Sequence, residues 1–312
     1  MASSVAPRAD HLVWKRTSVL DRVAMYGVAG PDGGIPVVFL HGWALGSHTY
    51  KRALKRLAHL GCRVFAPALP GFGGTADLGG DDLSIEGYAR WVGAFLDAVD
   101  LHRKVILVGH SFGGGVAIET AYGFPDRVRT LVLINSIGGS AWSTSGSTVR
   151  SMAERPLWDW GIHFPRDILP LPQLRRVLPV ILEDAVPNVI RNPRAVWRVA
   201  HLARRADLTP ELEELKRRKL PVVVLWGEDD KIITRDSFDA LCLAIGSPGA
   251  VVAGNHSWLL ADPDSFGEVM TNVIGVAEVA REEEARRPRR RSRRPRELAS
   301  FDSGAPDDEA AS

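Results

Sequence analysis

Short apolar runs alternate with amphipathic segments along most of the chain. Strands buried on both faces of a sheet have such nearly unbroken hydrophobicity, and longer amphipathic segments between them are typical of helices. The alternation predicts an α/β fold with a mostly parallel sheet that helices cover on both faces. The predicted strands are Val37–Leu40, Arg63–Ala66, Val105–Val108, Leu131–Ile134 and Val222–Trp226. The predicted helices are Thr49–Leu60, Ile85–Val99, Gly114–Gly123, Asp236–Ile245 and Asp264–Glu284.

Two parts of the chain depart from this alternation. His11–Leu20 and Arg22–Val28 alternate in polarity, which predicts an antiparallel pair at the edge of the sheet. The strand pattern stops after Ile134 and resumes at Leu220, and short helical segments rich in Trp and Pro lie between them. We therefore expect residues 1–137 and 219–281 to form the core, and residues 138–218 to form a helical cap inserted into it.

The last stretch, residues 282–312, is first rich in Arg and then acidic, with almost no apolar side chains. Such a composition has nothing to bury against the entropy of ordering, so we expect a disordered tail. Its arginines would suit an electrostatic contact with an anionic surface, although a solvated extension without a function is the more usual role of such a segment.

The net charge and the composition exclude several classes of partner and site. Lys and Arg total 39, Asp and Glu total 37, and the formal net charge of +2 is too small for a dedicated nucleic-acid binder, so no nucleic-acid partner is expected. Cys62 and Cys242 are the only cysteines and form neither a disulfide framework nor a metal-binding pair. We find no signal-peptide core and no stretch typical of a transmembrane segment, which indicates a cytoplasmic protein.

The run Val105–Val108 leads directly into Gly-His-Ser-Phe-Gly at residues 109–113, and a helix is predicted to follow. A G-x-S-x-G motif between a strand and a helix is typical of a catalytic nucleophile. The tight turn admits only small residues beside Ser111, and the strained serine projects its hydroxyl away from the sheet. The backbone N–H of Phe112 lies in the first helical turn, where the helix dipole favours an oxyanion.

With this motif, residues from about 12 to 280 resemble the α/β-hydrolase fold superfamily. Leu-His-Gly-Trp at residues 40–43 is similar to the family's loop after a buried strand, which implies that the backbone N–H of Trp43 is a second oxyanion donor. Residues 68–75 resemble the family's Pro-Gly-x-Gly loop. Residues 225–230 and 254–257 resemble the loops that supply the acid and the base.

The resemblance implies a catalytic triad in the chain order Ser111, Asp230, His256. His256 would take the serine proton, because imidazole, with an ordinary pKa of about 6.5, is the side chain suited to this task at neutral pH. Asp230 would hold the imidazole in the required tautomer. Glu228 and Asp229 are adjacent carboxylates, and the spacing of the family's loop favours Asp230 over them.

Other polar residues near the motifs have structural interpretations. His110 is expected to pack under the nucleophile turn, with a catalytic role as the alternative, and His41 to shape its loop through hydrogen bonds. No acid follows Ile134, because Asn135 and Ser136 occupy that position. Residues 71–76 match G-x-G-x-x-A, but an acidic loop follows where a phosphate-binding helix should begin, so no nicotinamide cofactor is expected.

The resemblance implies serine chemistry on an acyl group. The family's haloalkane dehalogenases and epoxide hydrolases use an aspartate nucleophile, and Ser111 disfavours both reactions. We expect hydrolysis of a small-molecule ester or thioester of a hydrophobic acyl group through an acyl-enzyme, with no cofactor and no metal. C–C bond hydrolysis, acyl transfer and perhydrolysis are alternatives on the same triad, and a non-catalytic ligand-binding module is the alternative of another class.

The predicted cap offers candidates for the substrate pocket. Its tryptophans suggest an apolar acyl pocket, with the cap's own core as the alternative. They are Trp142, Trp158, Trp160 and Trp197. Its arginines would suit the anionic substrate of a C–C hydrolase, although a solvated helix face is the more usual role of such spacing. They are Arg191, Arg194 and Arg198.

Overall fold

One sheet forms the centre of the protein. The structure, a computed structural model, describes residues 11–139 and 171–286. Within these residues eight strands lie in the order β1-β2-β4-β3-β5-β6-β7-β8. β2 is antiparallel to both β1 and β4, and the other neighbouring pairs are parallel, which confirms the predicted mostly parallel sheet. The strands are β1 (Val13–Val19), β2 (Arg22–Ala29), β3 (Ile35–Leu40), β4 (Cys62–Pro67), β5 (Val105–His110), β6 (Val128–Ile134), β7 (Val222–Gly227) and β8 (Ala250–Val252).

The pattern of apolar residues located most of these strands. Each of the predicted buried runs lies within an observed strand, and the expected antiparallel pair at the sheet edge is β1 with β2. β8 was not predicted. It has only three residues and lies at the edge of the sheet, so it is too short to show a periodic pattern.

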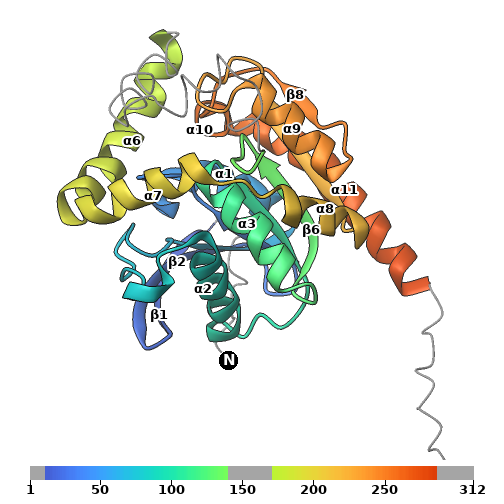
Figure 1. Ribbon diagram of the computed structural model, residues 1–312, viewed down its shortest axis with the longest axis horizontal. Coiled ribbons are helices and arrows are strands. Elements are labelled where there is room, and N and C mark those ends of the chain that lie inside the picture. Colours follow the sequence, from blue (N-terminus) through green and yellow to red (C-terminus); the bar gives the residue numbers. More distant parts are fainter. Residues whose placement is uncertain (1–10, 140–170, 287–312) are drawn as a thin grey trace, which may run out of the picture.

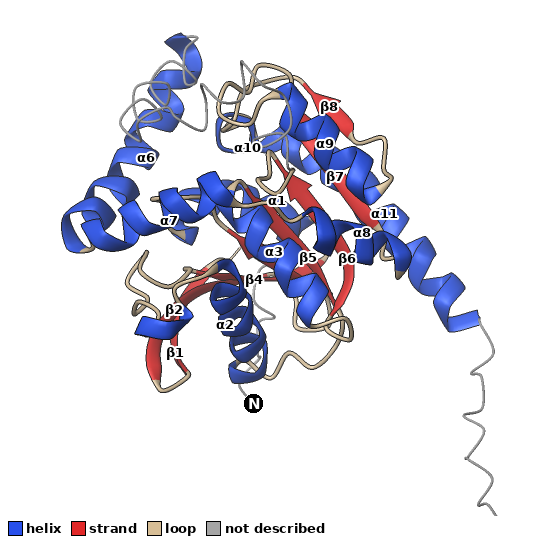
Figure 2. Cartoon of the chain, viewed as in Figure 1, coloured by secondary structure: helices blue, strands red, loops and turns tan. Residues whose placement is uncertain are grey.

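Helices cover both faces of the sheet. In β3 and β5, Val38 and Leu107 face one apolar core, whereas Val37 and Ile106 face the other, because successive strand side chains point in opposite directions. The α-helices that supply residues of the first core are α2, α3, α7, α8 and α9, and those of the second core are α1, α10 and α11 (Figure 1). Figure 2 shows the layers. The helices are η1 (Ser47–Tyr50), α1 (Lys51–His59), η2 (Gly80–Asp82), α2 (Ile85–Ala98), α3 (Phe112–Gly123), α6 (Leu171–Arg191), α7 (Pro193–Arg205), α8 (Thr209–Arg217), α9 (Arg235–Ile245), α10 (Trp258–Ala261) and α11 (Pro263–Arg286).

The described part of the predicted cap consists of α6, α7 and α8. α8 packs against α3 and α9, and its Leu212 and Leu215 are buried in the first core. α6 and α7 extend beyond the carboxyl ends of the central strands (Figure 1). The division between core and cap at residues 138 and 218 stays a prediction.

Polar side chains fasten α6 to the loops of the core. Asp184 Oδ2 accepts hydrogen bonds from the backbone N–H groups of Gly46 and Thr49, at 2.9 and 3.2 Å. One turn further along, Asn188 Oδ1 accepts from the N–H of Gly73 at 3.0 Å. Residues 184 and 188 are four apart and therefore lie on one face of the helix. This face holds α6 in a defined place over the sheet.

Part of the predicted tail belongs to a helix. α11 continues to Arg286, five residues into the stretch that we expected to be disordered, and residues 287–312 lie outside the described residues. Across the described ranges, none of the helices combines the length and the apolar character that crossing a membrane requires.

Candidate active site

Ser111 lies at the junction of β5 and α3, as its motif predicts. Its backbone has φ 54° and ψ −119°, a conformation that residues with a side chain rarely adopt. A Cβ atom at Gly109 would lie 2.4 Å from the Gly113 carbonyl oxygen, and one at Gly113 would lie 2.4 Å from the Leu40 carbonyl oxygen. Close backbone approach therefore requires both glycines, and the strained turn presents Ser111 to the pocket described below.

The fold brings Asp230 and His256 together from the ends of β7 and β8. His256 Nδ1 lies 2.8 Å from Asp230 Oδ2, and both side chains are buried. A carboxylate only accepts hydrogen bonds, so the neutral ring carries its hydrogen on Nδ1 and is unprotonated at Nε2. Asp230 Oδ1 accepts from the N–H groups of Ile232 and Ile233 at 2.8 and 2.9 Å. These bonds fix the carboxylate in the orientation that meets His256.

The neighbouring carboxylates do not share this environment. Glu228 and Asp229 are exposed, whereas Asp230 is 6% exposed and turned into the sheet end. Asp230 is thus the member of this acidic run that contacts His256.

Asn135 is a residue of the site that the sequence did not predict. It follows β6, and its Nδ2 donates to Asp230 Oδ2 at 2.5 Å. Its Oδ1 accepts from the indole Nε1–H of Trp258 at 2.9 Å. In the sequence, this position stands out only as one without an acid. Its place at the carboxyl end of a parallel strand, where ligands and catalytic groups gather, was the available signal.

His41 has the loop-shaping role that we expected. The backbone N–H of Leu69 donates to its Nε2, and its Nδ1 lies 2.8 Å from the carbonyl oxygen of Gly42, each bond linking the loop to its neighbours. Burial lowers the pKa of His41 to about 4, opposed by the Gly42 hydrogen bond and the charge of Asp184. His41 is therefore neutral near pH 7.

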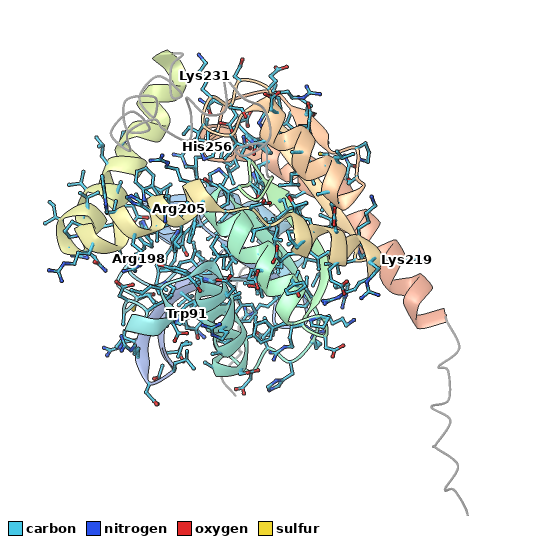
Figure 3. The ribbon with its side chains drawn as sticks, in the orientation of Figure 1. Trp91, Arg198, Arg205, Lys219, Lys231 and His256 are labelled. Atoms are coloured by element: carbon cyan, nitrogen blue, oxygen red, sulfur yellow. The ribbon has the colours of Figure 1, made fainter. Side chains whose placement is uncertain are left out.

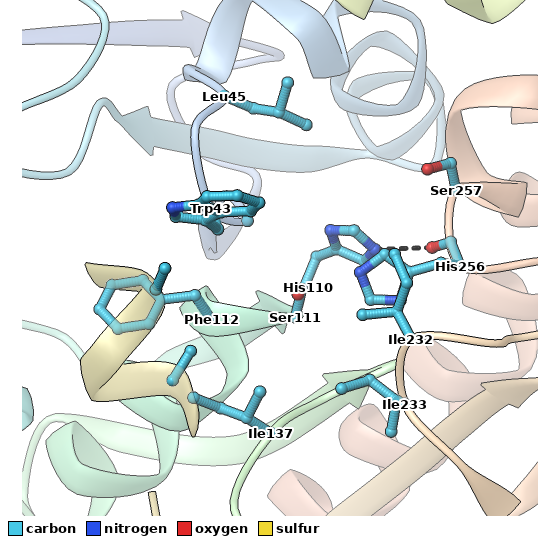
Figure 4. A pocket seen from close by; sticks show the side chains of 13 residues that line it. Trp43, Leu45, His110, Ser111, Phe112, Ile137, Ile232, Ile233, His256 and Ser257 are labelled. Atoms are coloured by element: carbon cyan, nitrogen blue, oxygen red, sulfur yellow. Dashed lines mark hydrogen bonds between the residues drawn. The ribbon is translucent and has the colours of Figure 1, made fainter. Parts of the chain in front are cut away.

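One pocket joins Ser111 and His256 (Figure 4). His110 and Ser257 also line it, and the rest of its wall is almost entirely apolar. Two small residues of that wall, Ala200 and Ala203, come from α7, so the insertion forms part of the roof. The other lining residues are Gly42, Trp43, Leu45, Phe112, Ile137, Ile232 and Ile233.

Trp43 and Phe112, the predicted oxyanion donors, both line this pocket. Phe112 is the first residue of α3, where backbone N–H groups have no partner within the helix. The Trp43 indole Nε1–H donates to the carbonyl oxygen of Val196 in α7 at 2.7 Å. This bond holds the Trp43 loop against the insertion.

The expectation that Trp197 lines the acyl pocket is wrong. Its side chain is 59% exposed and its ring packs against that of His201, with centroids 5.1 Å apart. The reason is helical periodicity: Val199 and Ala203 lie on the buried face of α7, and position 197 lies on the opposite one. Trp142, Trp158 and Trp160 lie outside the described residues.

The cap arginines do not enter this pocket either, as far as the described residues show. Arg198 lies on α7 (Figure 3) and forms an ion pair with Asp77, and Arg191 and Arg194 are exposed. The structure thus offers an anionic substrate no cation in the described wall. In residues 11–139 and 171–286, no group of three or more His, Cys, Asp or Glu is arranged to hold a metal ion.

Comparison with known proteins agrees with this architecture. The model of the Alpha/beta hydrolase family matches residues 37–269. A protein of Mycobacterium phage D29 that is named as a non-heme haloperoxidase is 31% identical over 261 residues, covering 80% of this chain and 90% of its own. Two solved structures have the same fold. A membrane phospholipase A has a TM-score of 0.70 at 20% identity, covering 86% of this chain and 88% of its own. A thermophilic esterase from Thermogutta terrifontis has a TM-score of 0.67 at 20% identity, covering 85% and 99%. The chain belongs to the α/β-hydrolase family.

Proposed function

We propose that the protein is a serine hydrolase that cleaves a carboxylic ester or thioester of a hydrophobic acyl group through an acyl-enzyme. One observation carries the proposal: Ser111 of the strained turn and His256, the histidine of a buried Asp–His pair, line the same apolar pocket. A serine hydroxyl becomes an effective nucleophile only beside a base, and this arrangement supplies one together with a group that orients it.

In the proposed mechanism, Ser111 Oγ attacks the acyl carbonyl carbon while His256 Nε2 takes the hydroxyl proton. The carbonyl π electrons move to oxygen, and the N–H groups of Trp43 and Phe112 stabilise this oxyanion. Collapse of the tetrahedral intermediate breaks the bond to the leaving alcohol or thiol, which receives the proton from His256. Water then attacks the acyl-enzyme by the same route and releases the acid and Ser111. Asp230 holds Nδ1–H and stabilises the imidazolium.

The pocket wall supports an uncharged acyl group. Phe112, Ile137, Ile232 and Ile233 would exclude water from an alkyl chain, and burial of each methylene contributes about 0.8 kcal/mol to binding. The ion pair of Arg198 with Asp77 leaves that arginine engaged elsewhere, which disfavours C–C hydrolysis of an anionic diketone.

Perhydrolysis is the second candidate reaction, and the name of the phage D29 relative favours it. Hydrogen peroxide would replace water in the second step, so that attack of the peroxide oxygen on the acyl-enzyme yields a peracid and free Ser111. Hydrolysis and perhydrolysis thus share the acyl-enzyme and differ only in the acceptor.

A series of p-nitrophenyl esters from acetate to palmitate tests the proposal, with and without hydrogen peroxide and with Ser111→Ala as the blank. We expect turnover that depends on acyl length and is lost in Ser111→Ala, which at most retains binding and oxyanion effects. Peracid formation at the expense of the free acid would select perhydrolysis. Equal rates for wild type and Ser111→Ala across the whole series would instead favour the non-catalytic binding module.

A further inference from the structure

A chain of buried hydrogen bonds links three loops of the site. The backbone N–H of Gly42 donates to Tyr50 Oη at 3.1 Å, and Tyr50 Oη lies 2.8 Å from His110 Nδ1. His110 Nε2 lies 2.9 Å from the backbone carbonyl oxygen of His256. The linked groups come from different parts of the fold. Tyr50 is the last residue of η1, and His110 is the last residue of β5.

The direction of every bond in this chain follows from the chemistry of its ends. A carbonyl oxygen only accepts, so His110 Nε2 carries the hydrogen that it donates to His256. The neutral ring is then unprotonated at Nδ1, which accepts from the Tyr50 hydroxyl. The Tyr50 oxygen in turn accepts from the Gly42 N–H. Each hydrogen bond therefore joins one donor to one acceptor.

Burial makes this arrangement rigid and uncharged. The exposed fractions of Tyr50 and His110 are 0% and 2%, and the ring centroids of His110 and His256 are 4.9 Å apart. Burial, and next the positive charge that His256 acquires, lowers the pKa of His110 to about 3. His110 therefore stays neutral in the working pH range, which suits a fixed tautomer and does not suit a proton shuttle.

The ends of the chain adjoin the groups that the proposed reaction uses. Gly42 precedes Trp43, His110 precedes Ser111, and the carbonyl that accepts the last bond belongs to His256 itself. We propose that Tyr50 and His110 are positioning residues, which set the placement of the oxyanion loop, the nucleophile and the base relative to one another. This inference rests on the proposed serine hydrolase function for its kinetic consequences.

Substitutions can cut the two links of His110 separately. Tyr50→Phe removes the hydroxyl and keeps the ring. His110→Gln keeps a donor near the position of Nε2 and loses the acceptor for Tyr50, whereas His110→Asn keeps an acceptor near Nδ1 and loses the donor to His256. Tyr88→Phe is the matched control, since Tyr88 is equally buried and its hydroxyl donates to the carbonyl oxygen of Pro70, which is not one of the linked groups.

We expect kcat on the best p-nitrophenyl ester to fall by about 10- to 100-fold in Tyr50→Phe, with KM changed by less than about twofold, because an ångström of misplacement costs up to about 100-fold. His110→Asn should likewise lower kcat and leave KM nearly unchanged. Both Tyr50→Phe and His110→Gln cut the bond between Tyr50 and His110, and Tyr50→Phe also removes the acceptor of the Gly42 N–H. Their double variant should therefore lose little more than the worse single variant. Tyr88→Phe should keep the wild-type kcat.

Two outcomes would overturn the proposal. One is unchanged kcat in folded Tyr50→Phe, with thermal unfolding used to confirm folding. The other is a double variant whose loss is the product of the two single losses, which would mean that the residues act independently.

Backbone amide exchange tests the same coupling without turnover. If the links position the loops, Tyr50→Phe should speed exchange at residues 256–258, beyond the bond that was cut, and Tyr88→Phe should not. Exchange unchanged there would contradict the coupling. If wild type neither hydrolyses esters nor reacts at Ser111 with a fluorophosphonate, the proposed function fails. The exchange result still decides whether the linked hydrogen bonds position the loops.

Discussion

Both carboxylate oxygens of Asp230 accept hydrogen bonds, and one of the donors is the side-chain amide of Asn135. Asn135 donates to the same oxygen that accepts from His256, and it also accepts from Trp258. It connects β6 to the loop after β8. This bridging contact explains why a polar, positive-φ residue is buried here.

Asn135→Ala should remove support from the Asp230 carboxylate and destabilise the fold around it. Loss of one oriented donor should lower kcat by about tenfold. The unpaired indole N–H of Trp258 should cost about 1–3 kcal/mol of stability. Steady-state kinetics and urea unfolding measure the two effects, and exposed Asn272→Ala is the control. Wild-type kcat in Asn135→Ala would show that Asp230 needs no support from this amide.

Single residues also show where sequence reasoning ends. Ser111 could be predicted because its motif is local and the glycines beside it are dictated by the turn itself. The side-chain contacts of Asn135 with Asp230 and of Tyr50 with His110 could not be predicted, because these partners lie 95 and 60 residues away along the polypeptide. Trp197 was misplaced because composition identifies an aromatic but not the helix face that it occupies.

At the scale of elements, the first turn of α3 lies in direct backbone contact with the end of β3. Gly113 lies against the carbonyl oxygens of Leu40 and His41, at 2.4 and 2.5 Å from the position of a Cβ atom. Gly123, at the other end of the same helix, has nothing within 4 Å of that position. The backbone contact at position 113 thus requires glycine, whereas position 123 has room for a side chain.

Gly113→Ala should destabilise the protein by about 3 kcal/mol, because backbone atoms cannot yield as a flexible side chain would. Gly123→Ala should be neutral or stabilising by up to about 1 kcal/mol, from the better helix propensity of alanine. Urea unfolding of both variants measures the difference. A Gly113→Ala variant as stable as Gly123→Ala would mean that the turn relaxes freely.

The elements that the sequence missed are short or depend on tertiary contacts. β8 has three residues and α10 has four, too few for a period to appear. α8 falls within the expected cap and was not predicted as a separate helix, and its Leu212 and Leu215 are buried in the first core beside α3. Buried strands were predictable because burial on both faces requires an apolar residue at every position.

At the scale of the whole molecule, stability should depend on pH through Glu119. This carboxyl group of α3 is 8% exposed and faces Glu211, Glu86 and Arg90 from α8 and α2. Burial, then the charges of Glu211 and Glu86, raises its pKa from 4.5 to about 7, against the opposing charge of Arg90. Between pH 4.5 and about 7, Glu119 is therefore protonated in the folded state and ionised in the unfolded state.

Stability contributed by this proton is present below pH 4.5 and is lost as the pH rises through about 7. Glu119→Gln keeps an uncharged side chain, so it should be more stable than wild type by about 1–2 kcal/mol near pH 8 and no more stable near pH 4.5. Urea unfolding at the two pH values gives the comparison, with exposed Glu213→Gln as the control. A Glu119→Gln effect independent of pH would contradict the raised pKa.

Covalent labelling by a fluorophosphonate tests the central claim most directly, because the probe reacts with a serine that an adjacent base has activated. Intact-mass and peptide analysis should show one adduct, on Ser111, in wild type. The adduct should be absent in Ser111→Ala and form far more slowly in His256→Ala. An unlabelled wild type, or labelling that persists in Ser111→Ala, would contradict the account.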